Sequence, residues 1–160
     1  MKRFFGLFLL VFPLVPAVPQ ETAMQGFEHW TTADLWRLGQ ALNADAASDP
    51  HHVGVKQLAD FPKEAFLLAH READGQVEWH ETQIDIFFVQ SGSATLLVGG
   101  TYLNGETVAP HEKRNGTIQG GTRQKLSAGD IVRIPARVPH QLLLEGAREF
   151  TYFVVKVKGY

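Results

Sequence analysis

From His51 onward the chain consists of short runs rich in Val, Ile, Leu, Phe and Thr, which alternate with Gly, Pro and Asn. Runs of this kind predict β-strands bounded by turns. Many short strands with no helix between them favour an antiparallel sandwich or a small barrel, so the predicted fold class is all-β. The expected strands are 53–59, 65–72, 76–81, 84–90, 93–98, 122–127, 131–134, 139–144 and 149–157.

One short helix is predicted before the β region. Thr31 or Thr32 can cap its first turn, and Asp34 lies near its positive end. The helix should end at about Ala46 and cover a sheet. Its apolar face is expected to contain Leu35, Leu38, Ala41 and Leu42.

The first residues are typical of an export signal. Lys2-Arg3 precedes an uncharged apolar run, Phe4–Val18, which is shorter than the roughly 20 residues that cross a bilayer. We expect a signal peptide over 1–23, cleaved near 17 or 23, and a secreted or periplasmic protein with no membrane segment in its mature form. An uncleaved membrane-tethering helix is the alternative.

Length and charge narrow the remaining possibilities. A chain of 160 residues suits one domain. We expect residues 24–64 to form the helix and a lead-in strand, and 65–160 to form the barrel. Lys plus Arg number 15 against 17 Asp plus Glu, which argues against nucleic acid as a partner. The chain has no Cys, which excludes disulfides, Cys-liganded zinc and a thiol nucleophile.

Two stretches place polar side chains on predicted inward faces: 75–92, with a turn expected at Ser91-Gly92-Ser93, and 129–140. Glu78 and His80 are two residues apart on a strand, so they point the same way. Asp85 precedes two core residues on its face, and an aspartate there is costly unless it is paired or binds a metal. His140 likewise begins an apolar row, which continues through Leu142 and Leu144.

The spacing in these stretches resembles the paired motifs of the cupin superfamily, small jelly-roll barrels that commonly hold a metal. The first motif is Gly, His-x-His, four residues, Glu, six residues and Gly. The second is Gly, five residues, Pro-x-Gly, two residues, His, three residues and Asn. In this chain Gly92, Gly129, Pro135 and His140 fall on register, while Glu78, Asp85, Arg137 and Leu144 replace the usual His, Glu, Gly and Asn.

The resemblance covers roughly 65–157 and implies a cupin jelly-roll β-barrel with one divalent metal inside. Its ligands would be Glu78, His80, Asp85 and His140. Two nitrogens and two oxygens suit Mn, Fe, Zn or Ni rather than Ca or a thiophilic ion. The alternative is a metal-free site, with Glu78 and His80 paired and His140 a hydrogen-bonded core residue.

Two functions remain open at this stage. The protein could be a metal-dependent enzyme with a small-molecule substrate, using oxygenase, lyase or isomerase chemistry, or a non-catalytic small-molecule-binding or storage cupin. The sequence does not identify catalytic residues. The strand at 84–90 is apolar on both faces, so the helix or a second subunit must cover its outer face. We expect a homodimer.

The segment from Gly99 to Gly121 is predicted to be a long connection. It contains six glycines and the charged run His111 to Arg114. It would be either a lid that meets an anionic ligand or a solvated surface loop. Of the other histidines, His29, His51 and His52 are expected to be exposed, and His70 to lie in the core or at the surface.

Overall fold

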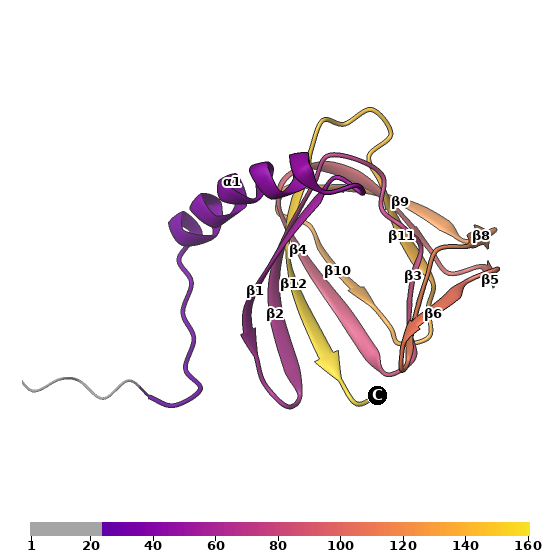
Figure 1. Cartoon of the computed structure of the whole chain (residues 1–160), viewed down its shortest axis with the longest axis horizontal. Coiled ribbons are helices and arrows are strands. Elements are labelled where there is room, and N and C mark those ends of the chain that lie inside the picture. Colours follow the sequence, from indigo (N-terminus) through magenta and orange to yellow (C-terminus); the bar gives the residue numbers. More distant parts are fainter. Residues whose placement is uncertain (1–23) are drawn as a thin grey trace, which may run out of the picture.

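The computed structural model describes residues 24–160, so the predicted signal peptide lies outside the described residues. As predicted, β-structure dominates. The strands curl into an antiparallel half-barrel, and the one helix among residues 24–160 lies beside one end (Figure 1). The elements are α1 (Thr32–Ser48), β1 (Val53–Asp60), β2 (Glu64–Arg71), β3 (Glu78–His80), β4 (Gln83–Val98), β5 (Thr101–Leu103), β6 (Glu106–Ala109), β7 (Glu112–Arg114), β8 (Thr117–Gln119), β9 (Thr122–Ser127), β10 (Ile131–Ile134), β11 (His140–Leu143) and β12 (Phe150–Lys158).

Helix α1 begins as predicted. The Thr31 side chain accepts a hydrogen bond from the backbone of Asp34, whose carboxylate accepts one in return, which forms a capping box. The helix packs on β1 and β2. Ala41, expected on the buried face, is exposed, and Ala46 is buried instead. The buried stripe therefore follows the spacing of Leu42 and Ala46, one turn apart.

Strand β4 is the centre of the sheet. The strand order is β1-β2-β12-β4-β11-β3-β7-β6, and β9 and β10 also pair with β4. The first half of β4 pairs with β12 and β10, and its second half pairs with β11 and β9. One strand thereby belongs to both walls of the half-barrel, which curve towards each other in Figure 1.

The turn predicted at Ser91-Gly92-Ser93 is wrong, because β4 runs through it without a break. The pairing register with β12 shifts at this point, which marks a bulge. Gly92 has a φ of 75°, and a Cβ there would lie 2.0 Å from the carbonyl oxygen of Glu149. A glycine in a bulge needs the same positive φ as a glycine in a turn, so the Ser-Gly-Ser sequence alone could not distinguish a bulge from a turn.

The long connection predicted over 99–121 is also wrong. It folds into four short strands, in which β6 pairs with β7 and β5 pairs with β8. The β6–β7 hairpin extends one wall of the half-barrel by pairing with β3. The turn of this hairpin is at Pro110-His111, where His111 has a φ of 66°. Asn104-Gly105 joins β5 to β6 and Asn115-Gly116 joins β7 to β8, with φ angles of 55° and 62° at the two asparagines. These strands lack the apolar rows that would have identified them.

The two faces of the sheet differ in how they are covered. Inward-facing residues of both walls form the core, among them Phe87, Leu96 and Phe150. On the outer face, Phe88 and Ile131 are paired neighbours and remain 38% and 66% exposed. Because α1 packs on β1 and β2, the outer face of β4 and β10 is left partly uncovered. Within the described part of the chain, no helix is long and apolar enough to cross a membrane.

Candidate metal centre

The structure brings the four predicted ligands together at one place on the inner wall. One donor atom from each of Glu78, His80, Asp85 and His140 lies within 4.8 Å of the others. The Nε2 atom of His80 is 3.2 Å from Asp85 Oδ2 and 3.5 Å from Glu78 Oε2, and His140 Nε2 is 3.6 Å from Asp85 Oδ2. His80, Asp85 and His140 are buried, and Glu78 is half-buried.

Strand pairing explains this convergence. Glu78 and His80 occupy alternate positions on β3 and therefore share its inner face. His140 opens β11 directly opposite Glu78. Asp85 comes from the first half of β4, across the interior from β3. The two-residue spacing and the apolar rows that suggested this site in the sequence therefore describe real neighbours.

Lys156 lies among the four candidate ligands and was missed in the sequence. It is directly opposite Asp85 in the β12–β4 ladder. Its Nζ donates to both carboxylate oxygens of Asp85, at 2.8 and 3.0 Å, and lies 3.3 Å from His80 Nε2. The alternation along β12 could have identified it, because Lys156 ends the inward-facing row that contains Phe150, Tyr152 and Val154.

Strand β7 contributes two further groups from the segment expected to be a loop. The carboxylate of Glu112 is 2.5 Å from His80 Nδ1, and Arg114 pairs with Glu78. Arg71 of β2 approaches the other oxygen of Glu78 at 3.5 Å. We call the eight residues together the polar cluster: Arg71, Glu78, His80, Asp85, Glu112, Arg114, His140 and Lys156.

Pairing within the polar cluster keeps its acids ionised. Burial disfavours the charged form of Asp85, but the neighbouring imidazoles of His140 and His80 and the charge of Lys156 lower its pKa below the usual range. The pKa of Glu78 is also lowered, because His80 and Arg114 outweigh its burial. Burial opposes the charged form of His80, yet hydrogen bonds to Asp85, Glu112 and Glu78 raise its pKa to about 10.

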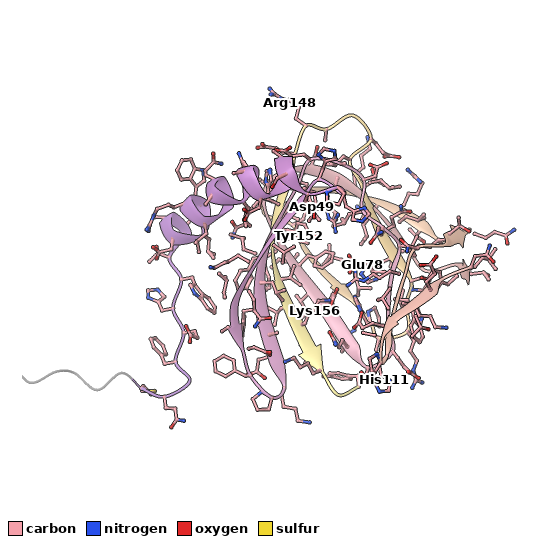
Figure 2. All side chains as sticks on the ribbon, viewed as in Figure 1. Asp49, Glu78, His111, Arg148, Tyr152 and Lys156 are labelled. Atoms are coloured by element: carbon pink, nitrogen blue, oxygen red, sulfur yellow. The ribbon has the colours of Figure 1, made fainter. Side chains whose placement is uncertain are left out.

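The polar cluster faces a cavity of about 240 Å³ between the two walls. Glu78, Tyr152 and Lys156 project into the space between the walls in Figure 2. One side of the cavity is apolar, with Val53, Leu67 and Val154 among its lining residues. The remainder is polar and includes Arg71, Glu78, Asp85, Arg114, His140 and Lys156.

No protein-family model matches the chain, and no curated protein is similar to it in sequence. Solved structures do resemble it. The cupin domain of Cnp3 from Schizosaccharomyces pombe has a TM-score of 0.51 and 11% identity over 66% of this chain and 64% of that chain. The chain has the cupin fold.

Two other similar structures cover slightly more of the chain. KdgF from Halomonas sp. has a TM-score of 0.50 and 16% identity over 71% of this chain and 85% of that chain. A variant of PAC13 from Streptomyces, solved with uridine, has a TM-score of 0.50 and 9% identity over 70% of this chain and 74% of that chain. Identities this low indicate a shared cupin fold and nothing finer.

The residues at the centre of this cupin fit a metal ion. Two imidazoles and two carboxylates form a donor set that first-row divalent metals accept. Each imidazole has its Nδ1 next to an acceptor: Glu112 for His80, and the Val138 carbonyl, at 3.1 Å, for His140. This arrangement orients both Nε2 atoms inwards, as partners of metal-bound histidines do. The Nε2 atom of His140 is buried and lacks a hydrogen-bond partner among the described residues.

The remaining histidines lie outside the cluster. His29, His51 and His52 are exposed, as predicted, although His51 also lines the cavity. His70 is buried, and its Nδ1 lies 2.8 Å from Thr151 Oγ1. It therefore belongs to the core, which was one of the two predicted locations.

Proposed function

We propose that this chain is an exported metal-dependent cupin that acts on a small organic molecule in its cavity. The metal would be one divalent ion, Mn, Fe, Zn or Ni, held by Glu78, His80, Asp85 and His140. The observation that carries this proposal is the convergence of the four donor atoms within 4.8 Å, at a place where Glu78, Asp85 and His140 line the cavity. A bound metal would supply Lewis-acid chemistry or activate O2 or water in oxygenase, lyase or isomerase reactions.

The residues around the cavity suggest how a substrate would be held. Arg71 and Arg114 line the cavity next to Glu78 and would attract a carboxylate or another anionic group. Arg71 Nε also donates to Tyr152 Oη at 3.0 Å, which fixes the guanidinium in place. The apolar side of the cavity would hold the carbon skeleton. PAC13, solved with uridine, supports a small molecule as the kind of ligand that this fold accepts.

Glu112 would control the proton on His80. Its carboxylate is positioned to accept a hydrogen bond from Nδ1–H, which leaves Nε2 directed at the candidate ligands. Glu112 is on β7, in the hairpin that extends the wall from β3. The hairpin would therefore fix the orientation of a ligand histidine while Arg114, two residues on, meets the substrate.

A non-catalytic small-molecule-binding or storage cupin is the second candidate. The observation that favours it is that the acids of the polar cluster already have cationic partners within the protein. Asp85 pairs with Lys156, and Glu78 with Arg71 and Arg114. A cluster neutralised in this way does not require a metal to remain folded.

Elemental analysis of protein purified without added metal is the first test. We expect about one equivalent of Mn, Fe, Ni or Zn per chain.

The stability of the fold with added metal is the second test. Metal a hundredfold above its dissociation constant should raise the free energy of unfolding by about 2.7 kcal/mol. This gain should vanish in His140→Ala and persist in His29→Ala, which removes an exposed histidine as a control. Two results together would show that the metal site is wrong. A chelator would leave the melting temperature of wild type unchanged, and each of the four ions would change the melting temperatures of wild type and His140→Ala by the same amount.

A ligand screen distinguishes the two functions. Small organic acids and phenols would be incubated with the metal-loaded protein and followed by mass spectrometry. An enzyme converts one of them, and the reaction stops in His140→Ala. A ligand that binds and is recovered unchanged supports the binding or storage protein.

Export rests on the sequence and is part of the proposal. The mature protein should begin near Val18 or Met24. The intact mass of protein recovered from the periplasm or medium measures this directly. A full-length mass in a soluble fraction would refute export.

We also propose a homodimer formed by the outer face of β4 and β10. The exposed pair Phe88 and Ile131 supports it, since a second copy would cover this apolar surface. Light scattering at tens of micromolar should give twice the chain mass, and Ile131→Asp should give a monomer. A monomeric wild type would contradict the dimer.

A further inference from the structure

The Nζ of Lys156 lies against two of the four candidate ligands, where it would be an immediate neighbour of a metal bound to them. It bonds both oxygens of Asp85, at 2.8 and 3.0 Å, and lies 3.3 Å from His80 Nε2. A metal that shares Asp85 and His80 would be about 2.0–2.2 Å from each donor atom. The ammonium and the metal would then be in direct contact. Two cations cannot share such a small buried volume, because they repel strongly there.

We propose that Lys156 is a built-in cation that holds the four candidate ligands together without metal, and that a metal binds only by displacing it. This inference rests on the proposed metal site and adds its loading step and the metal concentration that loading requires. In the metal-free protein the ammonium offsets the buried charge of Asp85, whose side chain is 2% exposed. The incoming metal takes over the same role with a larger charge and shorter bonds.

The structure provides a place for the displaced side chain. Lys156 lines the cavity and its side chain is 20% exposed, so the ammonium can move towards the cavity without crossing the apolar core. Figure 2 shows Lys156 pointing into the space between the walls. The long flexible stem of lysine permits this movement by rotation about its own bonds.

Displacement makes Lys156 raise the concentration at which each metal fills the site. Every ion must first break the bonds between Lys156 and Asp85, so each ion loses the same amount of binding free energy. Zn and Ni bind nitrogen and oxygen donors more strongly than Mn does. At equal concentration, the weaker ion is therefore the one that fails to load.

Lys158 provides a matched control on the same strand. It is two residues after Lys156 and pairs with Asp60, away from the candidate ligands. Mn²⁺ affinity would be measured at pH 7.5 by competition with a fluorescent chelator, in wild type, Lys156→Met and Lys158→Met. We expect Lys156→Met to bind Mn²⁺ about tenfold more tightly or better. Lys158→Met should match wild type.

Amine labelling tests the same inference without any substitution. Wild-type protein would be acetylated briefly, with and without saturating Zn²⁺, and each lysine quantified by mass spectrometry. Displacement predicts that Zn²⁺ makes Lys156 severalfold more reactive and leaves Lys158 unchanged. This measurement decides the question even if Lys156→Met fails to fold.

The outcomes separate this inference from the proposed function. If wild type binds metal, and either Lys156→Met binds no more tightly or Lys156 labelling does not change, displacement is wrong and the metal site stands. If wild type and both variants bind none of Mn, Fe, Ni and Zn, the proposed metal site is wrong and the inference falls with it.

Discussion

The two ends of the barrel interior differ sharply, although the same strands build both. Strand β12 has Phe150 at one end of its inward row and Lys156 at the other. Strand β11 begins inward with His140, and its row continues into Leu142 and Leu144. One end is consequently an apolar core, and the other is the polar cluster beside the cavity.

The difference shows where stability and chemistry originate. The apolar end gains free energy from burial, which does not depend on pH or on any ion. The polar end gains little from its ion pairs, because taking charges out of water costs about as much as the pairing returns. Breaking one pair, however, leaves a buried charge without a partner. The polar end should therefore be sensitive to solution conditions, and the apolar end should not.

The largest effect is expected from Phe150→Ala at the apolar end. Phe150 is 0% exposed, so its removal should lower the free energy of unfolding by about 3–5 kcal/mol. Urea denaturation should give the same loss with and without metal. Val108→Ala, at a position 54% exposed, should change stability by less than about 0.5 kcal/mol. If the loss of unfolding free energy in Phe150→Ala depended on metal, the two ends would not contribute independently to stability.

Lys156→Met at the polar end should have the next largest effect. Without metal it removes the cation nearest to the buried Asp85 carboxylate, at a cost of about 3 kcal/mol. Lys158→Met removes a more exposed pair and should cost less than about 1 kcal/mol. Adding Zn²⁺ should recover most of the first loss and none of the second. Equal stability of the two metal-free variants would show that Lys156 does not hold the cluster.

A smaller effect is expected from pH in the metal-free protein. His80 has a pKa raised to about 10, so its contribution is complete below the ordinary histidine value near 6.5 and is lost as pH rises to about 10. Asp85 has a lowered pKa, so its contribution is present above about 4 and is lost as pH falls further. Urea midpoints should fall in both directions. The alkaline fall should be weaker in His80→Gln, whereas the loss from Phe150→Ala should stay constant.

The smallest expected effect is the release of protons when a metal binds. Since the pKa of His80 is raised to about 10, it carries a proton at pH 7.5 and must release it to bind a metal. Calorimetric titration of Zn²⁺ in buffers of different ionisation enthalpy should therefore show net proton release. His80→Gln should release less. A binding enthalpy that is the same in every buffer would contradict protonated His80.

The sequence predicted most of the β-strands and the helix, because alternating rows and a helix cap are local signals. It also placed Glu78, His80, Asp85 and His140 in one site, and the structure brings them together. Their metal-binding role stays a prediction. Glu78 and His80 were recognisable by their two-residue spacing, and Asp85 and His140 because each adjoins an apolar row.

Lys156, Glu112 and Arg114 were missed for different reasons. Lys156 ends an apolar row as Asp85 begins one, but a lysine near a strand end is usually a surface residue. Glu112 and Arg114 lie in strands with no apolar face, so alternation could not identify them. Their inward direction depends on pairing with β3, which is a tertiary contact.

The bulge at Gly92 has a consequence for how the molecule can open. Because β4 is hydrogen-bonded to four other strands across both walls, neither wall can separate without breaking β4 ladders. Amide hydrogens on either side of Gly92 should therefore exchange with solvent through one shared opening event. The β5–β8 ribbon, bonded only to itself among the described strands, should exchange much earlier. A ligand would then enter past moving side chains at the cavity rim and not by a hinged parting of the walls.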